Sequence, residues 1–168
     1  MEIEHKYLIE RDSLPAGFDT FPSKALKQGY LIHQPALRIR KETLLPDGES
    51  EYILTYKDKG GLARQEINIT LPAEAGEKLF GKCDGYIIEK TRYLIPAGAK
   101  DTVSGRDLTI ELDVFSGELK GLIYAEVEFD SVESANAYIQ PEWFGKGVTG
   151  IKGYSNSDLS LFGMPANL

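Results

Sequence analysis

The sequence has very few residues with thiol or imidazole side chains. It contains one cysteine, Cys83, and two histidines, His5 and His33. A single cysteine cannot form an internal disulfide, and these three residues are too few to propose a zinc or iron–sulfur centre. Any metal site in this chain would therefore be built from carboxylates, which bind hard cations such as Mg²⁺ or Mn²⁺.

The sequence also lacks long apolar runs and an excess of positive charge. No run approaches the length that spans a bilayer, and the charged first residues have no apolar signal-peptide core, so we expect a cytoplasmic protein. A net charge of −7 argues against broad nucleic-acid binding, which needs a basic face. It leaves room for a small polyanion, because screening makes the local site matter more than the total charge.

What is present is the composition of an ordinary globular protein. Hydrophobic residues make up 42% and charged residues 27% of 168 residues. This length is sufficient for one sizeable core, and we find no internal repeat, linker or low-complexity segment. We therefore predict a single domain over residues 1–168.

Strand signals dominate the chain. The expected strands cover residues 1–8, 27–32, 36–41, 51–57, 64–70, 86–94, 108–115 and 122–129. We expect the strand that carries Lys90 and Arg92 to end at Pro96. Helices are expected over about 73–82, over 132–139 with Asp130 and Glu133 as a capping box, and from Ser155 to near Gly163.

Seven or eight successive strands without βαβ spacing indicate a mainly β protein of the α+β class. The strands would form an antiparallel sheet or a closed barrel with a few flanking helices.

Charged residues recur at a spacing of two in these strands, which places them on one face. The first strand carries Glu2, Glu4 and Lys6. Further pairs of one sign are Arg38 with Arg40, Lys90 with Arg92, Glu111 with Asp113, and Glu126 with Glu128. Like charges side by side repel, so such pairs are stable if basic pairs face acidic pairs, or if both face a ligand and its metal.

The opposite face of the same strands is apolar, for example Leu37 and Ile39, or Ala125, Val127 and Phe129. An ordinary sheet with solvated charges is one interpretation. A charged interior with a covered apolar exterior is the other. We favour it because the two charged residues of each of these later pairs have the same sign.

Such an interior suits an oligophosphate. Arginine and lysine side chains from several strands could bind its oxygens. Carboxylates on the other wall would repel each other and the phosphates unless a divalent cation lay between them. The pattern therefore predicts a metal-bound oligophosphate, whose phosphoryl group the metal would polarise.

The motifs resemble those of a known superfamily. Glu2-Ile3-Glu4-His5-Lys6 matches the ExExK signature of the CYTH, or triphosphate tunnel metalloenzyme, superfamily. The later strands resemble those of its short bacterial members, in order and over nearly the whole chain: Gln28–Leu31, Arg38–Arg40, Leu54–Lys57, Arg64–Glu66, Glu89–Tyr93, Glu111–Phe115 and Ala125–Phe129. The resemblance implies a closed eight-stranded antiparallel β-barrel tunnel. It also implies hydrolysis or cyclisation of triphosphates with Mg²⁺ or Mn²⁺.

The same resemblance implies roles for individual residues. Glu2, Glu4 and Glu128 would hold the principal metal, with Glu126 and Asp113 as further ligands or supporting groups. Glu66, Arg64 and Glu111 would line the tunnel and orient neighbours or water. The phosphates would be bound by Lys6, Arg38, Arg40, Lys57, Lys90 and Arg92, and we extend this set to Arg64. We assign the catalytic roles to Lys6, Glu66, Glu111, Asp113 and Glu126.

One position departs from the family pattern. Val148-Thr149-Gly150 is followed by Ile151-Lys152, where related bacterial sequences often carry an acidic residue. Lys152 would either contact phosphate or be solvated, and we expect the latter.

The leading hypothesis is an inorganic triphosphatase that hydrolyses tripolyphosphate by attack of water. The alternatives are an adenylyl cyclase or a nucleoside or thiamine triphosphatase of the same superfamily, a polyphosphate-binding module without turnover, and an acidic structural protein. The sequence leaves open the exact substrate, the metal and the number of metal ions. It also leaves open which carboxylate positions the water, and whether the chain forms a homodimer.

Overall fold

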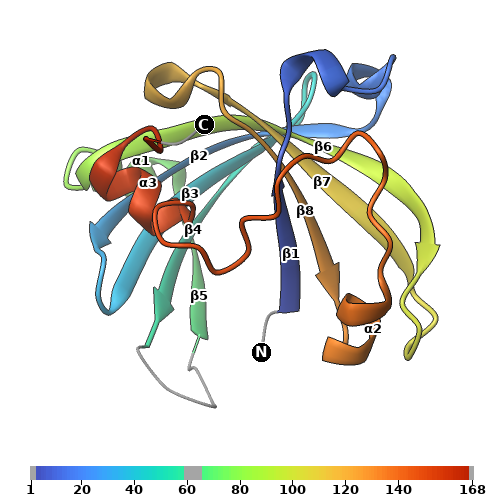
Figure 1. The fold of residues 1–168 in the computed structure, drawn as a ribbon. Helices are drawn as coiled ribbons and strands as arrows, with labels where there is room; N and C mark the ends of the chain where they lie inside the picture. Colours follow the sequence, from blue (N-terminus) through green and yellow to red (C-terminus); the bar gives the residue numbers. More distant parts are fainter. Residues whose placement is uncertain (1–2, 59–65, 167–168) are drawn as a thin grey trace.

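The computed structural model describes residues 3–58 and 66–166, and its centre is one antiparallel sheet (Figure 1). The sheet has eight strands in the order β1-β8-β7-β6-β2-β3-β4-β5. Their bounds are β1 Ile3–Leu8, β2 Ser23–Ile32, β3 Ala36–Leu44, β4 Ser50–Lys57, β5 Glu66–Leu71, β6 Asp84–Lys100, β7 Asp107–Ser116 and β8 Ile123–Phe129. The helices are α1 Ala73–Phe80, α2 Val132–Ala137 and α3 Asn156–Phe162, with short 3₁₀ turns at Arg11–Ser13, Phe18–Thr20 and Gly117–Leu119. The prediction of a mainly β, antiparallel fold is confirmed.

The sheet curves round but its two edge strands, β1 and β5, are not paired with each other in the described residues. The expected closed barrel is therefore not confirmed. The C-terminal segment, residues 138–155 and orange to red in Figure 1, lies along the edge of β1 instead. The amide of Leu8 donates to the carbonyl of Lys146 at 2.9 Å, and the amide of Val148 donates to the carbonyl of Lys6 at 2.8 Å. These bonds occupy backbone groups of Lys6 and Leu8 at the edge of β1.

Most of the outer face of the sheet is apolar and covered. Over β1, β7 and β8, Val127, Leu112 and Tyr7 pack in a cluster with Phe144 from the C-terminal segment and Ala135 of α2. Over β3 and β4, a second cluster joins Ile39 and Tyr52 to Phe80 of α1.

The inner face carries the charges. Lys6, Lys90, Arg92, Asp113 and Glu126 are all buried although they are ionisable. A third cluster, which includes Ile88, Phe115, Tyr124 and Leu159 of α3, contributes apolar residues at one end of this face. The prediction of a charged interior is confirmed. The predicted cover of the apolar exterior is confirmed over most strands but not over β5, where Ile67 and Ile69 are exposed.

Two local predictions were wrong. β6 does not end at Pro96 but continues to Lys100, because the pairing with β7 shifts register between Pro96 and Lys100. Proline is tolerated at such an irregularity, where the ladder lacks its regular bonds. The cap of α2 is Ser131 rather than Asp130: its hydroxyl accepts a hydrogen bond from the amide of Ser134 at 3.0 Å. Asp130 instead pairs with Arg106.

None of the helices in residues 3–58 and 66–166 combines the length and the apolar character that crossing a membrane would require.

Candidate active site

The inner face encloses a polar cavity of about 390 Å³. It lies between the strands and the start of α3. Eight of the residues expected in the site line this cavity: Glu4, Lys6, Arg38, Arg40, Lys57, Arg92, Glu126 and Glu128. They come from five different strands, so the fold gathers side chains that are far apart in sequence.

One wall of the cavity is acidic. β1 and β8 are paired so that Glu4 lies opposite Glu128 and Lys6 lies opposite Glu126. Because directly opposed residues of an antiparallel pair share a face, the carboxylates of Glu4 and Glu128 lie on the same side of the sheet. Two like charges in this position repel, which favours a cation between them.

Lys6 lies within this acidic wall. Its Nζ is 3.0 Å from Oε1 of Glu126 and 3.7 Å from a carboxylate oxygen of Glu4. Burial alone would lower the pKa of Lys6, but the two carboxylates outweigh it and raise the pKa above its ordinary value. Lys6 is therefore a permanent cation beside the acids.

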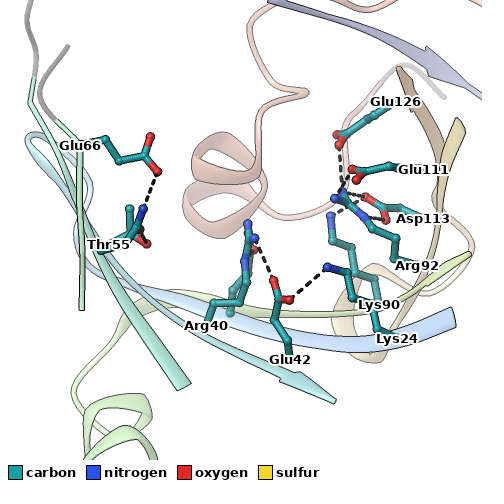
Figure 2. Close-up of polar contacts among 12 residues, drawn as sticks. Lys24, Arg40, Glu42, Thr55, Glu66, Lys90, Arg92, Glu111, Asp113 and Glu126 are labelled. Carbon is teal, nitrogen blue, oxygen red and sulfur yellow. Dashed lines mark hydrogen bonds and ion pairs between the residues drawn. The ribbon is translucent and has the colours of Figure 1, made fainter. Parts of the chain in front are cut away.

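Arg92 is the centre of a larger buried network (Figure 2). Its Nε donates to Oδ1 of Asp113 at 2.7 Å and its Nη2 donates to Oδ2 at 2.8 Å, which is a bidentate contact. Nη2 also donates to Glu126 at 2.9 Å, and Nη1 donates to Glu111. Burial raises the pKa of Glu111, and Arg92 only partly opposes this. The guanidinium therefore ties three acidic side chains of β7 and β8 together.

Lys90 and Asp113 form a buried ion pair behind the cavity. The side chain of Lys90 is 1% exposed and that of Asp113 is 0% exposed. Burial would raise the pKa of Asp113, but Lys90 and Arg92 hold it well below its usual range. Neither residue lines the cavity described above, so the expected contacts of Lys90 with phosphate and of Asp113 with metal or substrate gain no support from this arrangement.

The opposite wall is basic. Arg38, Arg40 and Lys57 line it, together with the hydroxyl-bearing Thr55. Burial and the neighbouring Arg40 lower the pKa of Arg38, although arginine stays protonated at any physiological pH. The Nε of Arg38 is buried and has no hydrogen-bond partner in the described residues. An unpaired buried donor beside a second cation fits an anionic ligand.

Glu66 lies beside this basic wall, at the start of β5 (Figure 2). It pairs with Lys57 at 3.2 Å and accepts a hydrogen bond from the amide of Asn68 at 3.1 Å. Asn68 in turn accepts from Thr55 at 2.7 Å. These contacts favour the expected orienting role of Glu66. Glu2 and Arg64, which were also expected in the site, lie outside the described residues.

Several lining residues were missed by the sequence interpretation. Tyr30 and His33 lie at the cavity, and so do Ser155, Asn156 and Ser157 at the start of α3. The rings of Tyr30 and His33 stack with centroids 5.0 Å apart. Tyr30 belongs to the Gln28–Leu31 motif, which was interpreted only as a strand, and Ser155 was interpreted only as a helix cap. Neither feature of the sequence indicated that these residues would line the cavity.

Lys152 lies at a neighbouring cavity of about 460 Å³. This second cavity shares Glu4, Lys6 and Ser155 with the first one and also includes Thr149 and Asp158. The side chain of Lys152 is exposed. It therefore lies near the acidic wall without being part of the main cavity.

The donor set fits a hard divalent cation. In residues 3–58 and 66–166, no cluster of three or more histidine, cysteine or acidic side chains is arranged to hold a metal. Two oxygen donors, Glu4 and Glu128, nevertheless face each other on the cavity side, and carboxylates are the preferred protein ligands of Mg²⁺ and Mn²⁺. With cations on the facing wall, the cavity can bind a metal–polyphosphate complex.

Comparison with known proteins identifies two relatives of nearly the same length. An inorganic triphosphatase of Nitrosomonas europaea is 38% identical over 165 residues, which cover 95% of this chain and 97% of the relative. An inorganic triphosphatase of Acetivibrio thermocellus is 31% identical over 168 residues, which cover 94% of this chain and 92% of the relative. No protein-family model matches the sequence.

Comparison with solved structures points to the same group of proteins. The crystal structure of the inorganic triphosphatase NE1496 superposes with a TM-score of 0.66 at 35% identity, covering 96% of this chain and 95% of the other. A putative adenylyl cyclase from Hippeastrum, HpAC1, shares the fold with a TM-score of 0.54 at 16% identity, over 82% of this chain and 83% of the other. The chain therefore belongs, with the two inorganic triphosphatases, to the CYTH, or triphosphate tunnel metalloenzyme, superfamily.

Proposed function

We propose that this protein is an inorganic triphosphatase that hydrolyses tripolyphosphate. The observation that carries the proposal is the cavity in which a basic wall faces an acidic wall. This arrangement suits a short polyanion with its metal ion. The names of the relatives, at 38% and 31% identity over most of the chain, support the same reaction.

The basic wall binds the phosphate chain in this proposal. Arg38 and Arg40 offer planar guanidinium groups, which can contact two phosphate oxygens at once, and Lys57 adds a point charge. Lys6 reaches the phosphate from the acidic side, since its amine already lies between Glu4 and Glu126. The expected phosphate contact of Lys90 is not part of the proposal, because Lys90 is buried against Asp113.

Glu4 and Glu128, with Glu2 from the resemblance, would hold Mg²⁺ or Mn²⁺. A bound divalent cation neutralises charge on the phosphates and polarises the phosphoryl group that is attacked. The protein's own acids have a second role. Glu126 lines the cavity and is held by Arg92, so it can orient water near the phosphate without moving. Glu111 also bonds Arg92 but is not among the residues that line the cavity, so its role is to position Arg92. Asp113 positions Arg92 and does not itself contact substrate.

We further propose that the passage around the substrate is completed by the C-terminal segment and α3, rather than by pairing of β1 with β5. The segment is bonded to the edge of β1, and Ser155 to Ser157 line the cavity. An enclosed passage limits access of bulk water to the bound phosphates.

The test is phosphate release from tripolyphosphate, with Mg²⁺ and Mn²⁺ in parallel and ATP and thiamine triphosphate as competing substrates. We expect orthophosphate from tripolyphosphate, with turnover that depends on the added cation. Folded protein that binds tripolyphosphate but releases no phosphate would contradict the proposal. Formation of cyclic AMP from ATP would instead identify a cyclase.

A further inference from the structure

Arg40 is held by two neighbours that neither the sequence motifs nor the proposed mechanism assigns to the site. Its Nε donates to Oε1 of Gln28 at 3.2 Å, and its Nη1 donates to Oε1 of Glu42 at 3.2 Å. The other carboxylate oxygen of Glu42 accepts from Lys24 at 3.0 Å. Figure 2 shows Arg40, Glu42 and Lys24 in a row on the inner face of the sheet.

The strand register explains why these residues meet. Gln28 of β2 lies directly opposite Arg40 of β3, so the two side chains share a face. Glu42 follows Arg40 by two residues on β3, and alternation places it on that face as well. Lys24 reaches Glu42 from β2. Two strands therefore fix the guanidinium from both sides.

The burial of Gln28 indicates that its side chain is needed as a hydrogen-bond acceptor. The residue is 0% exposed, and its Nε2 has no hydrogen-bond partner in the described residues. A buried amide with an unpaired donor costs free energy. Leucine would fill the same space without that cost, but it could not accept a hydrogen bond from Arg40. The contact with Arg40 is thus the one hydrogen bond that accounts for an amide here.

Glu42 presents a second apparent cost. It places a negative charge beside Arg40, which lines the cavity proposed to bind phosphate. Burial would raise the pKa of Glu42, but Lys24 and Arg40 hold it below the ordinary value, so the carboxylate is ionised at neutral pH. As a charge, Glu42 weakens the attraction of the wall for a polyanion. As a hydrogen-bond acceptor, it restricts the long side chain of Arg40.

We propose that Gln28 and Glu42 are positioning residues that preorganise Arg40 for the phosphate chain. An arginine side chain loses about 2 kcal/mol of rotamer freedom when it is fixed, and neighbours that fix it in advance remove that cost from binding. Gln28 and Glu42 bond Nε and Nη1, and neither of these bonds uses Nη2, which stays available for phosphate in this proposal. This inference rests on the proposed function, because it assumes that Arg40 binds phosphate.

The test uses two substitutions of Glu42 with opposite expectations. Binding of tripolyphosphate is measured by titration calorimetry without divalent cations, so that no turnover occurs. If Glu42 acts only as a charge, E42A tightens binding. If it positions Arg40, E42A weakens binding about 5- to 10-fold, the net effect of one hydrogen bond of ordinary strength. E42Q, which keeps an acceptor oxygen and loses the charge, binds at least as tightly as the wild type.

A double-mutant cycle tests Gln28. We expect Q28L to weaken binding about 5- to 10-fold in the wild type and less than about twofold in R40A, because its effect acts through Arg40. T43V, on the opposite face of β3, serves as the control. Wild-type protein that neither binds nor hydrolyses tripolyphosphate would refute the proposed function itself. Wild-type binding with additive Q28L and R40A effects, or with tighter binding by E42A, would refute the positioning role alone.

Discussion

Glu4 and Glu128 lie directly opposite each other in the pairing of β1 with β8, and both line the central cavity. Two carboxylates on one face at this spacing repel each other in the absence of a cation. Lys6 lies 3.7 Å from Glu4 and compensates part of this repulsion, and the proposed metal would compensate the rest.

E128Q removes one of these two charges. Without divalent cations, we expect the melting temperature to stay the same or to rise, because the repulsion is relieved. With Mn²⁺ at about 100 times its Kd, the wild type should gain about 2.7 kcal/mol of stability, and the variant should lose most of that gain. Differential scanning calorimetry with and without Mn²⁺ measures both effects. The exposed Glu118 offers a control, E118Q, which should behave as the wild type; equal Mn²⁺ stabilisation of E128Q would argue against the metal site.

R92M should destabilise the fold severely. It leaves Asp113 buried without its bidentate partner and leaves Glu111 and Glu126 without a shared cation. Breaking a buried ion pair from one side costs about 3–5 kcal/mol. Urea unfolding should show this loss. K100M breaks the exposed Lys100–Asp107 pair instead, and its cost should be below about 1 kcal/mol. Similar losses for the two variants would mean that the network around Arg92 contributes little.

R38K tests the unpaired Nε of Arg38. The variant keeps the positive charge but loses the planar group that can bond two phosphate oxygens. We expect KM for tripolyphosphate to rise about tenfold, which corresponds to one lost hydrogen bond to a charged group. Steady-state phosphate release gives this value. R11K makes the same exchange at an exposed position and should leave KM unchanged. An unaltered KM in R38K would show that charge alone is sufficient there.

Asp101 should make the fold sensitive to acid. Its carboxylate accepts backbone hydrogen bonds from Val103 and Ser104, each at 3.0 Å, and from Asp130 at 2.9 Å. These bonds hold the pKa of Asp101 well below its ordinary value of 3.8. A lowered pKa in the folded state means that the stabilisation is complete above the ordinary value and is lost as the pH falls through the folded value.

D101N should therefore be less stable than the wild type at pH 7, and its stability should fall less steeply between pH 5 and pH 2. Thermal unfolding across this range is the measurement. Parallel curves for the two proteins would show that the titration of Asp101 is not linked to folding.

Most of the strand pattern could be predicted from the sequence because alternation is strong. Arg38 with Arg40, and Glu126 with Glu128, occupy the inner face that their spacing indicated. How close each side chain of that face lies to the cavity could not be predicted. Glu111 and Asp113 have the same spacing signal as Glu126 and Glu128, but both bond Arg92 and neither lines the cavity. Alternation indicates a face and gives no distance from the substrate.

The missed residues have a related cause. Glu42 continues the alternation of Arg38 and Arg40, yet its sign differs, so an interpretation based on pairs of one sign passed over it. Gln28 is uncharged and gave no electrostatic signal. The absence of pairing between β1 and β5 in the described residues could not be predicted from the sequence either. Nothing in the residues of β1 indicated that its backbone would bond the segment around Val148.

The pairing of β1 with the C-terminal segment has a consequence for the order of folding. The amide of Lys6 donates to Oγ1 of Thr149, a residue 143 positions further along the chain. Contacts between such distant positions form slowly, because a long loop must close first. We therefore expect the edge of β1 that bonds the C-terminal segment to be paired late in folding. Glu4 and Lys6 already lie opposite Glu128 and Glu126 through β8, so the late step would complete the neighbouring cavity lined by Thr149 after the acidic wall has formed.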